Sequence, residues 1–166
     1  VVDLQNVIKS ARAAFNNTPD LVGSIQRLLE ENAVYKKQAE EYARQKAQML
    51  ADELAGKAET LGEVKLIKLT ECEDAAMLRE AALALQKSQV GTALVAAYQI
   101  DGKPSLVLMY SADLVAAGKN AGKDIRNAAK FIMGGGGGQP GFASAGGKNP
   151  EGLSDALNAL IEAVKA

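Results

Sequence analysis

The feature that most constrains the fold is a helical pattern of about forty residues, from about Pro19 to Leu61. Apolar side chains recur in it at steps of three and four, the spacing of a coiled-coil interface: Leu21, Ile25, Leu28, Tyr35, Ala39, Tyr42 and Met49. Asn32 and Lys46 interrupt this stripe, and the outer face is densely charged. A helix of this length spans roughly 60 Å and cannot bury its own stripe. It therefore needs a second helix, a second chain or both.

A shorter amphipathic helix is predicted just before it, over residues 3–15. The stretch 16–20 separates the two helices, with Thr18 as the expected N-cap of the long helix and Pro19 at its first helical position. Gly62 is expected to end the long helix. Residues 1–62 are thus predicted to be a helical arm with coiled-coil character, and its candidate self-association residues are Leu21, Ile25, Leu28 and Tyr35. Because the chain starts at Val1 and almost at once with a helix, we expect it to be a piece of a longer protein.

The remainder, residues 63–166, alternates short apolar runs with helical patterns. Strands are predicted over 64–69, 92–98, 105–110 and 142–145, and helices over 74–86, 123–133 and 153–164. Asp101-Gly102 is a hairpin turn signal between two of the strands. The predicted fold class is α/β (α+β): a long-helix arm followed by a small globular domain with a central mixed sheet flanked by helices.

The chain has no histidine and one cysteine, Cys72. This excludes histidine-based catalysis and leaves Cys72 without a second thiol for a disulfide or a metal site. We therefore expect no catalytic residue, no metal and no cofactor in this chain, and a reduced, cytoplasmic setting. No apolar run is long enough to span a membrane. With a net charge of −1, any RNA contact must come from a local basic patch.

The most informative motif is a run of five glycines after the helix predicted at 123–133, within a glycine-rich loop predicted over 134–147. A single left-handed residue is enough to end a helix, so five glycines exceed that need. A backbone without side chains lets a ligand approach closely, and its N–H groups can converge on an anion; a flexible linker is the alternative. The spacing is that of neither a P-loop nor a dinucleotide site. The candidate nucleic-acid-binding residues are Gly134, Gly135, Gly136, Gly137, Gly138 and Gln139.

Basic residues precede the glycines. Lys123, Arg126 and Lys130 are spaced by three and four, so they share one helix face that leads to the glycine run. Such a face suits RNA phosphates. The alternative is an ordinary solvated face, whose cations favour the end of the helix dipole. Lys103 and Lys148 are weaker candidates for phosphate contact.

The stretch 106–147 closely resembles the C-terminal domain of bacterial alanyl-tRNA synthetases, a domain of the DHH-associated superfamily. The shared pattern is a short strand, Ser111-Ala112-Asp113-Leu114-Val115, a basic helix, the polyglycine, Gln139-Pro140 and Ala143-Ser144-Ala145-Gly146-Gly147. The helices over residues 4–61 resemble the helical connector of that family, so the resemblance covers nearly the whole chain.

This chain departs from the family pattern in two places. The family often has Arg-Pro-Asp where Gln139-Pro140-Gly141 stands. Related phosphoesterases carry a histidine in a Gly-Gly-His motif that contacts a substrate phosphate, whereas this chain has no histidine. The second departure favours the synthetase branch of the superfamily.

The resemblance implies a tRNA-binding and assembly module of an alanine–tRNA ligase, non-catalytic by itself. It would contact the outer corner of alanine-specific tRNA and link aminoacylation with editing. Both activities, with their ATP, Mg and Zn, would lie in other domains of the parent chain, and the helical arm would support a homodimer. Two other functions stay open: a purely structural dimerisation module, suggested by the apolar stripe, and the substrate-binding domain of a DHH-type oligonucleotide phosphoesterase.

Overall fold

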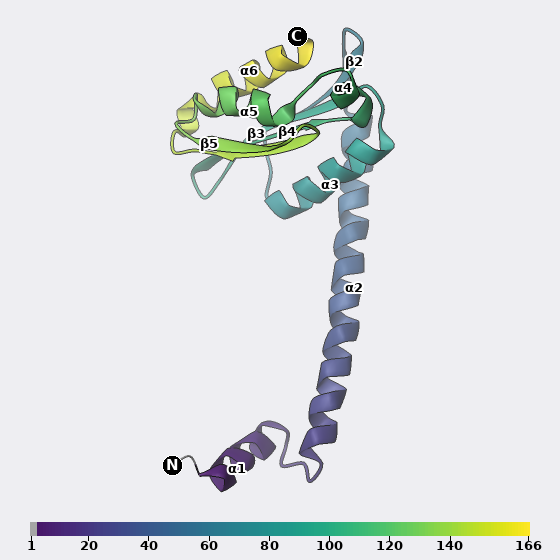
Figure 1. Ribbon diagram of the computed structural model, residues 1–166, viewed down its shortest axis with the longest axis vertical. Coiled ribbons are helices and arrows are strands. Elements are labelled where there is room, and N and C mark those ends of the chain that lie inside the picture. Colours follow the sequence, from purple (N-terminus) through teal and green to yellow (C-terminus); the bar gives the residue numbers. More distant parts are fainter. Residues whose placement is uncertain (1–2) are drawn as a thin grey trace. The chain divides into compact units, whose positions relative to one another are not determined.

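The computed structural model describes residues 3–166, which form helices and a mixed β-sheet (Figure 1). The helices of this range are α1 (Leu4–Ala14), α2 (Leu21–Gly56), α3 (Ala75–Ser88), α4 (Ala112–Ala116), α5 (Ala121–Ala129) and α6 (Leu153–Lys165), with a short 3-10 helix η1 (Pro150–Gly152). The strands are β1 (Glu59–Leu61), β2 (Val64–Leu69), β3 (Thr92–Ile100), β4 (Lys103–Tyr110), β5 (Gly135–Gln139) and β6 (Phe142–Gly146). The predicted fold class, a long helix followed by a mixed sheet with flanking helices, is confirmed.

The chain divides into two units, and the first contains α1 and most of α2 up to Ala43. The carboxylate of Asp20 accepts a hydrogen bond from the N–H of Gly23 at 2.9 Å, and it therefore caps α2. The predicted cap, Thr18, is wrong, because its hydroxyl instead accepts from the N–H of Asp20 at 3.2 Å. Among the described residues none before Ala47 is buried, so neither helix of this unit covers its apolar stripe.

The second unit begins at Arg44, inside α2, whereas the domain boundary predicted from the sequence lies between residues 62 and 63. Helix α2 ends at Gly56 and not at Gly62 as predicted. Gly62 has a positive φ of 65° and lies in the turn between β1 and β2, a hairpin that the sequence analysis missed. The last turns of α2 bury Ala51 and Leu54 and therefore belong to the globular unit.

The sheet of the second unit has the strand order β1-β2-β3-β4-β6-β5. Strands β2 and β3 are parallel and are joined by α3, and every other neighbouring pair is antiparallel. The turn between β3 and β4 is the predicted Asp101-Gly102 pair, and both residues have positive φ (51° and 74°), as a tight hairpin turn requires.

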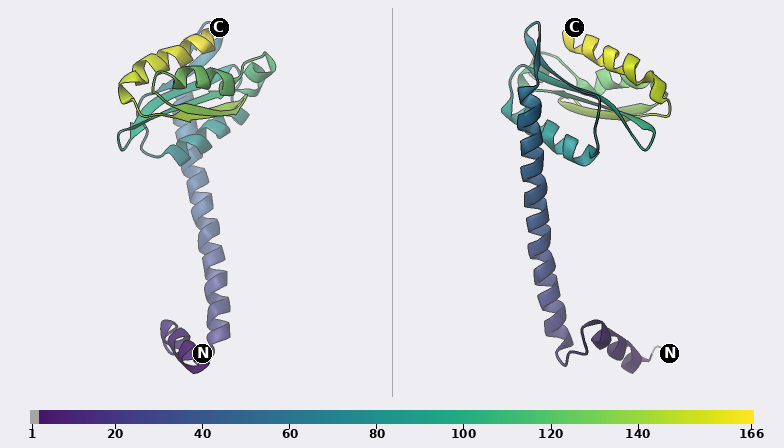
Figure 2. Two further views of the ribbon diagram at one scale, coloured as in Figure 1. Left: turned by 60° about the vertical axis from the view of Figure 1, so that its left-hand side comes forward. Right: turned by 180° about the vertical axis from the view of Figure 1, so that it is seen from behind.

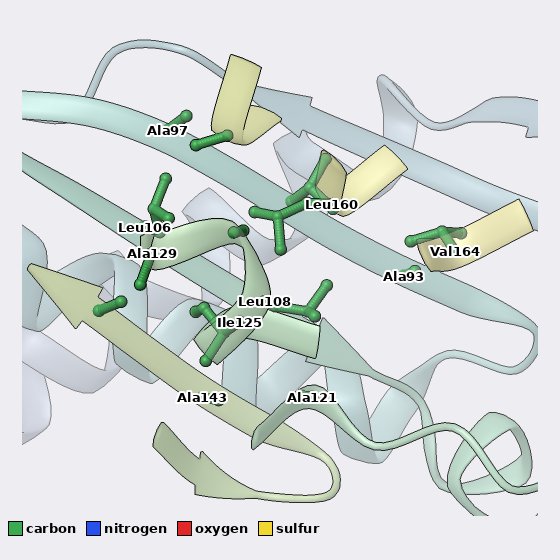
Figure 3. Close-up of a cluster of buried hydrophobic side chains, with 14 of the residues drawn as sticks. Ala93, Ala97, Leu106, Leu108, Ala121, Ile125, Ala129, Ala143, Leu160 and Val164 are labelled. Atoms are coloured by element: carbon green, nitrogen blue, oxygen red, sulfur yellow. The ribbon is translucent and has the colours of Figure 1, made fainter. Parts of the chain in front are cut away.

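Each face of the sheet is covered by helices. Figure 1 shows α5 and α6 on one side and α3 on the other, and the two views of Figure 2 agree. The close-up in Figure 3 shows how small side chains such as Ala93, Ala97 and Ala143 face α5 and α6, beside Ile125 and Leu160. Small residues on the strands let the helices lie close to the sheet, which fixes α5 next to the glycine-rich hairpin.

Candidate nucleic-acid interface

The five-glycine run forms most of strand β5, where the sequence predicted a loop. Strand β5 pairs only with β6, antiparallel and in register from Gly135↔Gly146 to Gln139↔Phe142. Pro140-Gly141 connects the two strands. As the last strand in the order, β5 forms an edge of the sheet, and this edge carries almost no side chains.

Alternate glycines of the run face the backbone of β6. A Cβ added at Gly134, Gly136 or Gly138 would come closer than 3.0 Å to main-chain atoms of that strand, a distance that real Cβ atoms essentially never show. These three positions therefore require glycine for packing alone. The requirement explains much of the run without any ligand.

The other two glycines face outward. A Cβ at Gly135 would meet no heavy atom within 4 Å, and one at Gly137 would make an ordinary contact, 3.5 Å from the Arg126 guanidinium. Neither residue has a positive φ, so nothing in the fold demands glycine at these two positions. The bare outer face of β5 is the part of the motif that packing does not explain.

Both ends of helix α5 form backbone hydrogen bonds to residues that flank strand β5. The N–H of Ala121 donates to the Pro140 carbonyl at 2.9 Å, and the N–H of Gly134 donates to the Ala129 carbonyl at 3.0 Å. Between them, a Cβ at Gly122 would lie 2.7 Å from the Gly138 carbonyl oxygen, so a missing side chain permits the close approach. The sequence analysis missed Gly122 because it began this helix at Lys123.

A better signal for the start of α5 was Asn120. Its side-chain oxygen accepts from the N–H of Lys123 at 3.0 Å, as an N-cap does. Placing the helix start there would have brought Gly122 into the first turn. A glycine inside a helix often marks close packing.

The three predicted cations lie on the exposed side of α5. Lys123, Arg126 and Lys130 are all exposed, and none forms an ion pair within residues 3–166. Arg126 lies beside Gly137, while Lys123 and Lys130 lie near the two ends of α5 that are bonded to the hairpin. The structure thus brings the predicted helix and the predicted glycine run side by side.

The buried side of α5 is anchored to the sheet by a polar pair. The hydroxyl of Tyr110, on β4, donates to Asp124 Oδ2 at 2.8 Å. Burial, and then the hydrogen bond to Asp124, raises the pKa of Tyr110 far above its usual range. The hydroxyl therefore stays protonated and remains a donor at every physiological pH. Tyr110 is fully buried in the core, and its role in holding α5 was not predicted.

Other basic residues near the motif are placed differently. The Lys119 ammonium donates to the carbonyls of Ala163 and Val164, at 2.8 and 3.0 Å, and so satisfies the end of α6. Lys103 and Lys148 are exposed, at the start of β4 and just after β6.

The turn Gln139-Pro140-Gly141 is where the chain departs from the family pattern. Gln139 is exposed, whereas Gly141 is buried, and the space for its Cβ is occupied by the Gln86 side-chain amide. The amide of Gln86 also donates to the Tyr110 carbonyl at 3.3 Å. An aspartate at position 141 would require Gln86 to move, so Gly141 is compatible with the observed position of the Gln86 side chain on α3.

The candidate self-association residues lie in the first unit. Ile25, Leu28 and Tyr35 are exposed by 38%, 44% and 64%, and Leu21 is half-buried. Their apolar surface faces solvent within the described chain. Whether a second chain covers it stays a prediction.

Two kinds of site are missing from the described part of the chain. Residues 3–166 contain no group of three or more histidine, cysteine, aspartate or glutamate side chains that could hold a metal ion. The same residues form no helix that is both long and apolar enough to cross a lipid bilayer.

An α+β fold with a glycine edge strand beside a basic helix defines a class of domain. Residues 63–166 match the family model of the DHHA1 domain, which is more than half of the chain. The chain belongs to the DHHA1 domain family. A solved DHH domain, from a member of the s1p family of ribosomal proteins, shares the fold at 12% identity and a TM-score of 0.52, covering 89% of this chain and 35% of that one.

Within this family the chain is similar to alanine–tRNA ligases. It is 42% identical over 161 residues to the ligase of Parabacteroides distasonis and 37% identical over 161 residues to that of Cytophaga hutchinsonii. The matches cover 96% and 95% of this chain but only 18% of each relative. The C-Ala domain from Aquifex aeolicus alanyl-tRNA synthetase matches with a TM-score of 0.58 and 28% identity, over 66% of this chain and 99% of that domain. The resemblance predicted from the sequence is confirmed.

Proposed function

We propose that this chain is the tRNA-binding and assembly module of an alanine–tRNA ligase, non-catalytic by itself. The observation that carries the proposal is the bare outer face of β5 beside the Arg126 cation, which forms no ion pair within residues 3–166. Similarity to alanine–tRNA ligases supports an alanine-specific tRNA as the RNA. In the parent enzyme the module contacts the outer corner of that tRNA and links aminoacylation with editing, activities that use ATP, Mg and Zn in other domains.

The physical basis is electrostatic contact plus close approach. Each cation that neutralises an RNA phosphate releases condensed counterions, which favours binding and makes it salt-dependent. A strand without outward side chains lets the sugar-phosphate chain come near its main-chain groups. Lys123, Arg126 and Lys130 together cover the length of α5 and supply the charge along that strand.

The first test is the triple variant Lys123→Gln, Arg126→Gln, Lys130→Gln in a filter or gel assay with alanine-specific tRNA. We expect weaker binding, and a salt slope lower by about two to three, since each lost phosphate contact removes somewhat less than one. The matched control is Lys9→Gln, Lys36→Gln, Lys37→Gln, which changes the net charge equally on the first unit. Equal effects of the two triple variants would remove α5 as the site.

The second test uses the glycine that packing does not require. Gly135→Leu should keep the fold, because a Cβ there meets no atom within 4 Å, but should weaken tRNA binding by blocking approach. Thr60→Leu is the control, since Thr60 is exposed on β1 at the opposite edge of the sheet. A Gly135→Leu variant that binds tRNA as tightly as the wild type would contradict a role for the strand surface.

A second candidate function, self-association through the arm, is favoured by the exposed apolar residues of the first unit. Val22, Ile25, Leu28, Leu29 and Tyr35 are all exposed there. Sedimentation equilibrium should give twice the chain mass of 17.3 kDa for the wild type and the chain mass for Ile25→Lys, Leu28→Lys. A dimer that ignores tRNA would favour the purely structural role over the first proposal, and a wild-type monomer would remove the second candidate.

A further inference from the structure

A groove of about 450 Å³ lies on the α3 side of the sheet, opposite α5 and α6. Its floor is formed by β3, β4 and β6 and its wall by the first turns of α3. The volume is within the range of roughly 300–1,000 Å³ that is typical of small-molecule sites. The polar side chains that line it are Arg79, Tyr98, Ser105 and Ser144.

Tyr98 is the unusual residue of this groove. Only 4% of it is exposed, yet its hydroxyl has no hydrogen-bond partner within residues 3–166, in contrast to the bonded hydroxyl of Tyr110. No buried side-chain nitrogen or oxygen atom of the described chain lacks a partner, so this hydroxyl must retain contact with solvent. Tyr98 is one of the residues that line the groove. Burial raises the pKa of Tyr98, so the group is a neutral donor.

A cation–π pair lines the same groove. The guanidinium carbon of Arg79, on α3, lies 5.4 Å from the centroid of the Phe142 ring, on β6. Arg79 is exposed and forms no ion pair within the described residues, so its planar group has an open face. Planar guanidinium and aromatic groups are surfaces on which nucleobases stack.

We propose that this groove binds an unstacked nucleobase of RNA, with the base stacked on the Arg79–Phe142 pair and the Tyr98 hydroxyl donating to a base acceptor. A flat ligand with acceptors at its edge fits a solvent-accessible neutral donor beside a cation–aromatic platform. The hydroxyls of Ser105 and Ser144 add further polar partners at the floor. The inference rests on the proposed function for the identity of its ligand as RNA.

The groove is continuous with the candidate interface through the hairpin. Its floor residues Phe142, Ser144 and Gly146 are the cross-strand partners of Gln139, Gly137 and Gly135 in β5. Directly opposed residues of an antiparallel pair point to the same face, so the outward-facing Gly135 and Gly137 share a face with Gly146 and Ser144 of the groove. One RNA segment at this edge can place its phosphates along α5 and one base in the groove.

The test uses adenosine and cytidine, which are uncharged and give the cations of α5 no phosphate to attract. Titrated into the ¹⁵N-labelled chain, they should shift the amide signals of Phe142, Ser144 and Gly146 and leave those of α5 in place. Tyr98→Phe keeps the ring and should weaken nucleoside binding at least about fivefold, and Arg79→Gln should weaken it about tenfold, as expected for one hydrogen bond and one stacked base. Lys87→Gln, which removes the same charge from the far end of α3, should change nothing.

Absence of shifts at millimolar nucleoside, or shifts that persist unchanged in Tyr98→Phe and Arg79→Gln, would overturn the proposal. The result is separable from the test of the α5 cations. Nucleoside binding in the groove together with unchanged tRNA binding by the α5 triple variant would leave the groove and remove the basic interface. The opposite pair of results would keep the interface and remove the groove.

Discussion

The glycines of β5 are identical in the sequence but differ in whether packing requires the absence of a side chain. Gly136 is held against the backbone of Ser144 and Ala145, whereas Gly135 faces open space. We expect Gly136→Ala to lower the free energy of unfolding by about 1–3 kcal/mol, the usual range for overpacking, because main-chain atoms must move. Gly135→Ala should be neutral or stabilising by up to about 1 kcal/mol, since it restricts the unfolded chain. Urea denaturation of both variants measures this, and equal effects would refute the assignment of the two faces.

A second residue-scale feature is the bonding of Asp113 between β3 and α4. Its carboxylate accepts from the N–H of Gly91 at 2.8 Å and from the hydroxyl of Ser111 at 2.6 Å, and that hydroxyl in turn accepts from the N–H of Thr92 at 3.0 Å. Chiefly the hydrogen bond from Ser111 lowers the pKa of Asp113 below 3.8. The Ser-Ala-Asp segment, which carried part of the family resemblance, thus has a structural role.

This network predicts a pH dependence of stability. The folded state lowers the pKa of Asp113, so the stabilisation is fully present above about pH 4 and is lost as the pH falls through the folded-state pKa. Asp113→Ala should cost about 1 kcal/mol at pH 7, a low figure because the carboxylate is exposed, and progressively less as the pH falls below the ordinary aspartate pKa. Urea midpoints of wild type and variant between pH 7 and pH 2.5 should converge. A gap that is constant over this range would contradict the assignment.

At the scale of elements, the helices and strands that could be predicted are those specified by residues close together in the sequence. The apolar runs of β3 and β4 and the Asp101-Gly102 turn were sufficient for that hairpin, because the turn geometry is fixed by two residues. Strand β5 was not predictable, because its four glycines have low strand propensity and form a strand through pairing with β6. The groove lined by Tyr98 was missed for the same reason: its residues come from strands and a helix far apart in sequence.

At the element scale, the hydrogen bond between Tyr110 of β4 and Asp124 of α5 can be tested by removing the Tyr110 hydroxyl. Tyr110→Phe removes the hydrogen bond to Asp124 and should lower the free energy of unfolding by about 1–2 kcal/mol, with faster hydrogen exchange at the amides of α5. Tyr98→Phe is the matched control, because the Tyr98 hydroxyl has no partner in the described chain and its loss should leave stability and exchange unchanged. Equal losses in the two variants would show that the Tyr110 bond does not anchor the helix.

For the whole molecule, the decisive question is where the independently folding part begins. The family model starts at residue 63, but Ala51 and Leu54 of α2 are almost completely buried against α3 and the sheet, and no described residue before Ala47 is buried. A chain of residues 44–166 should therefore match the unfolding free energy of the full chain. A chain of residues 57–166 keeps β1 but exposes the face that Leu54 covered, and it should be less stable by about 3–4 kcal/mol, from one buried leucine and the alanines beside it. Leu54→Ala in the full chain isolates most of this effect, at about 2–5 kcal/mol. Urea unfolding of the four chains orders them, and a 57–166 chain as stable as 44–166 would mean that α2 adds nothing to the globular unit, in which case the helix would serve only the arm.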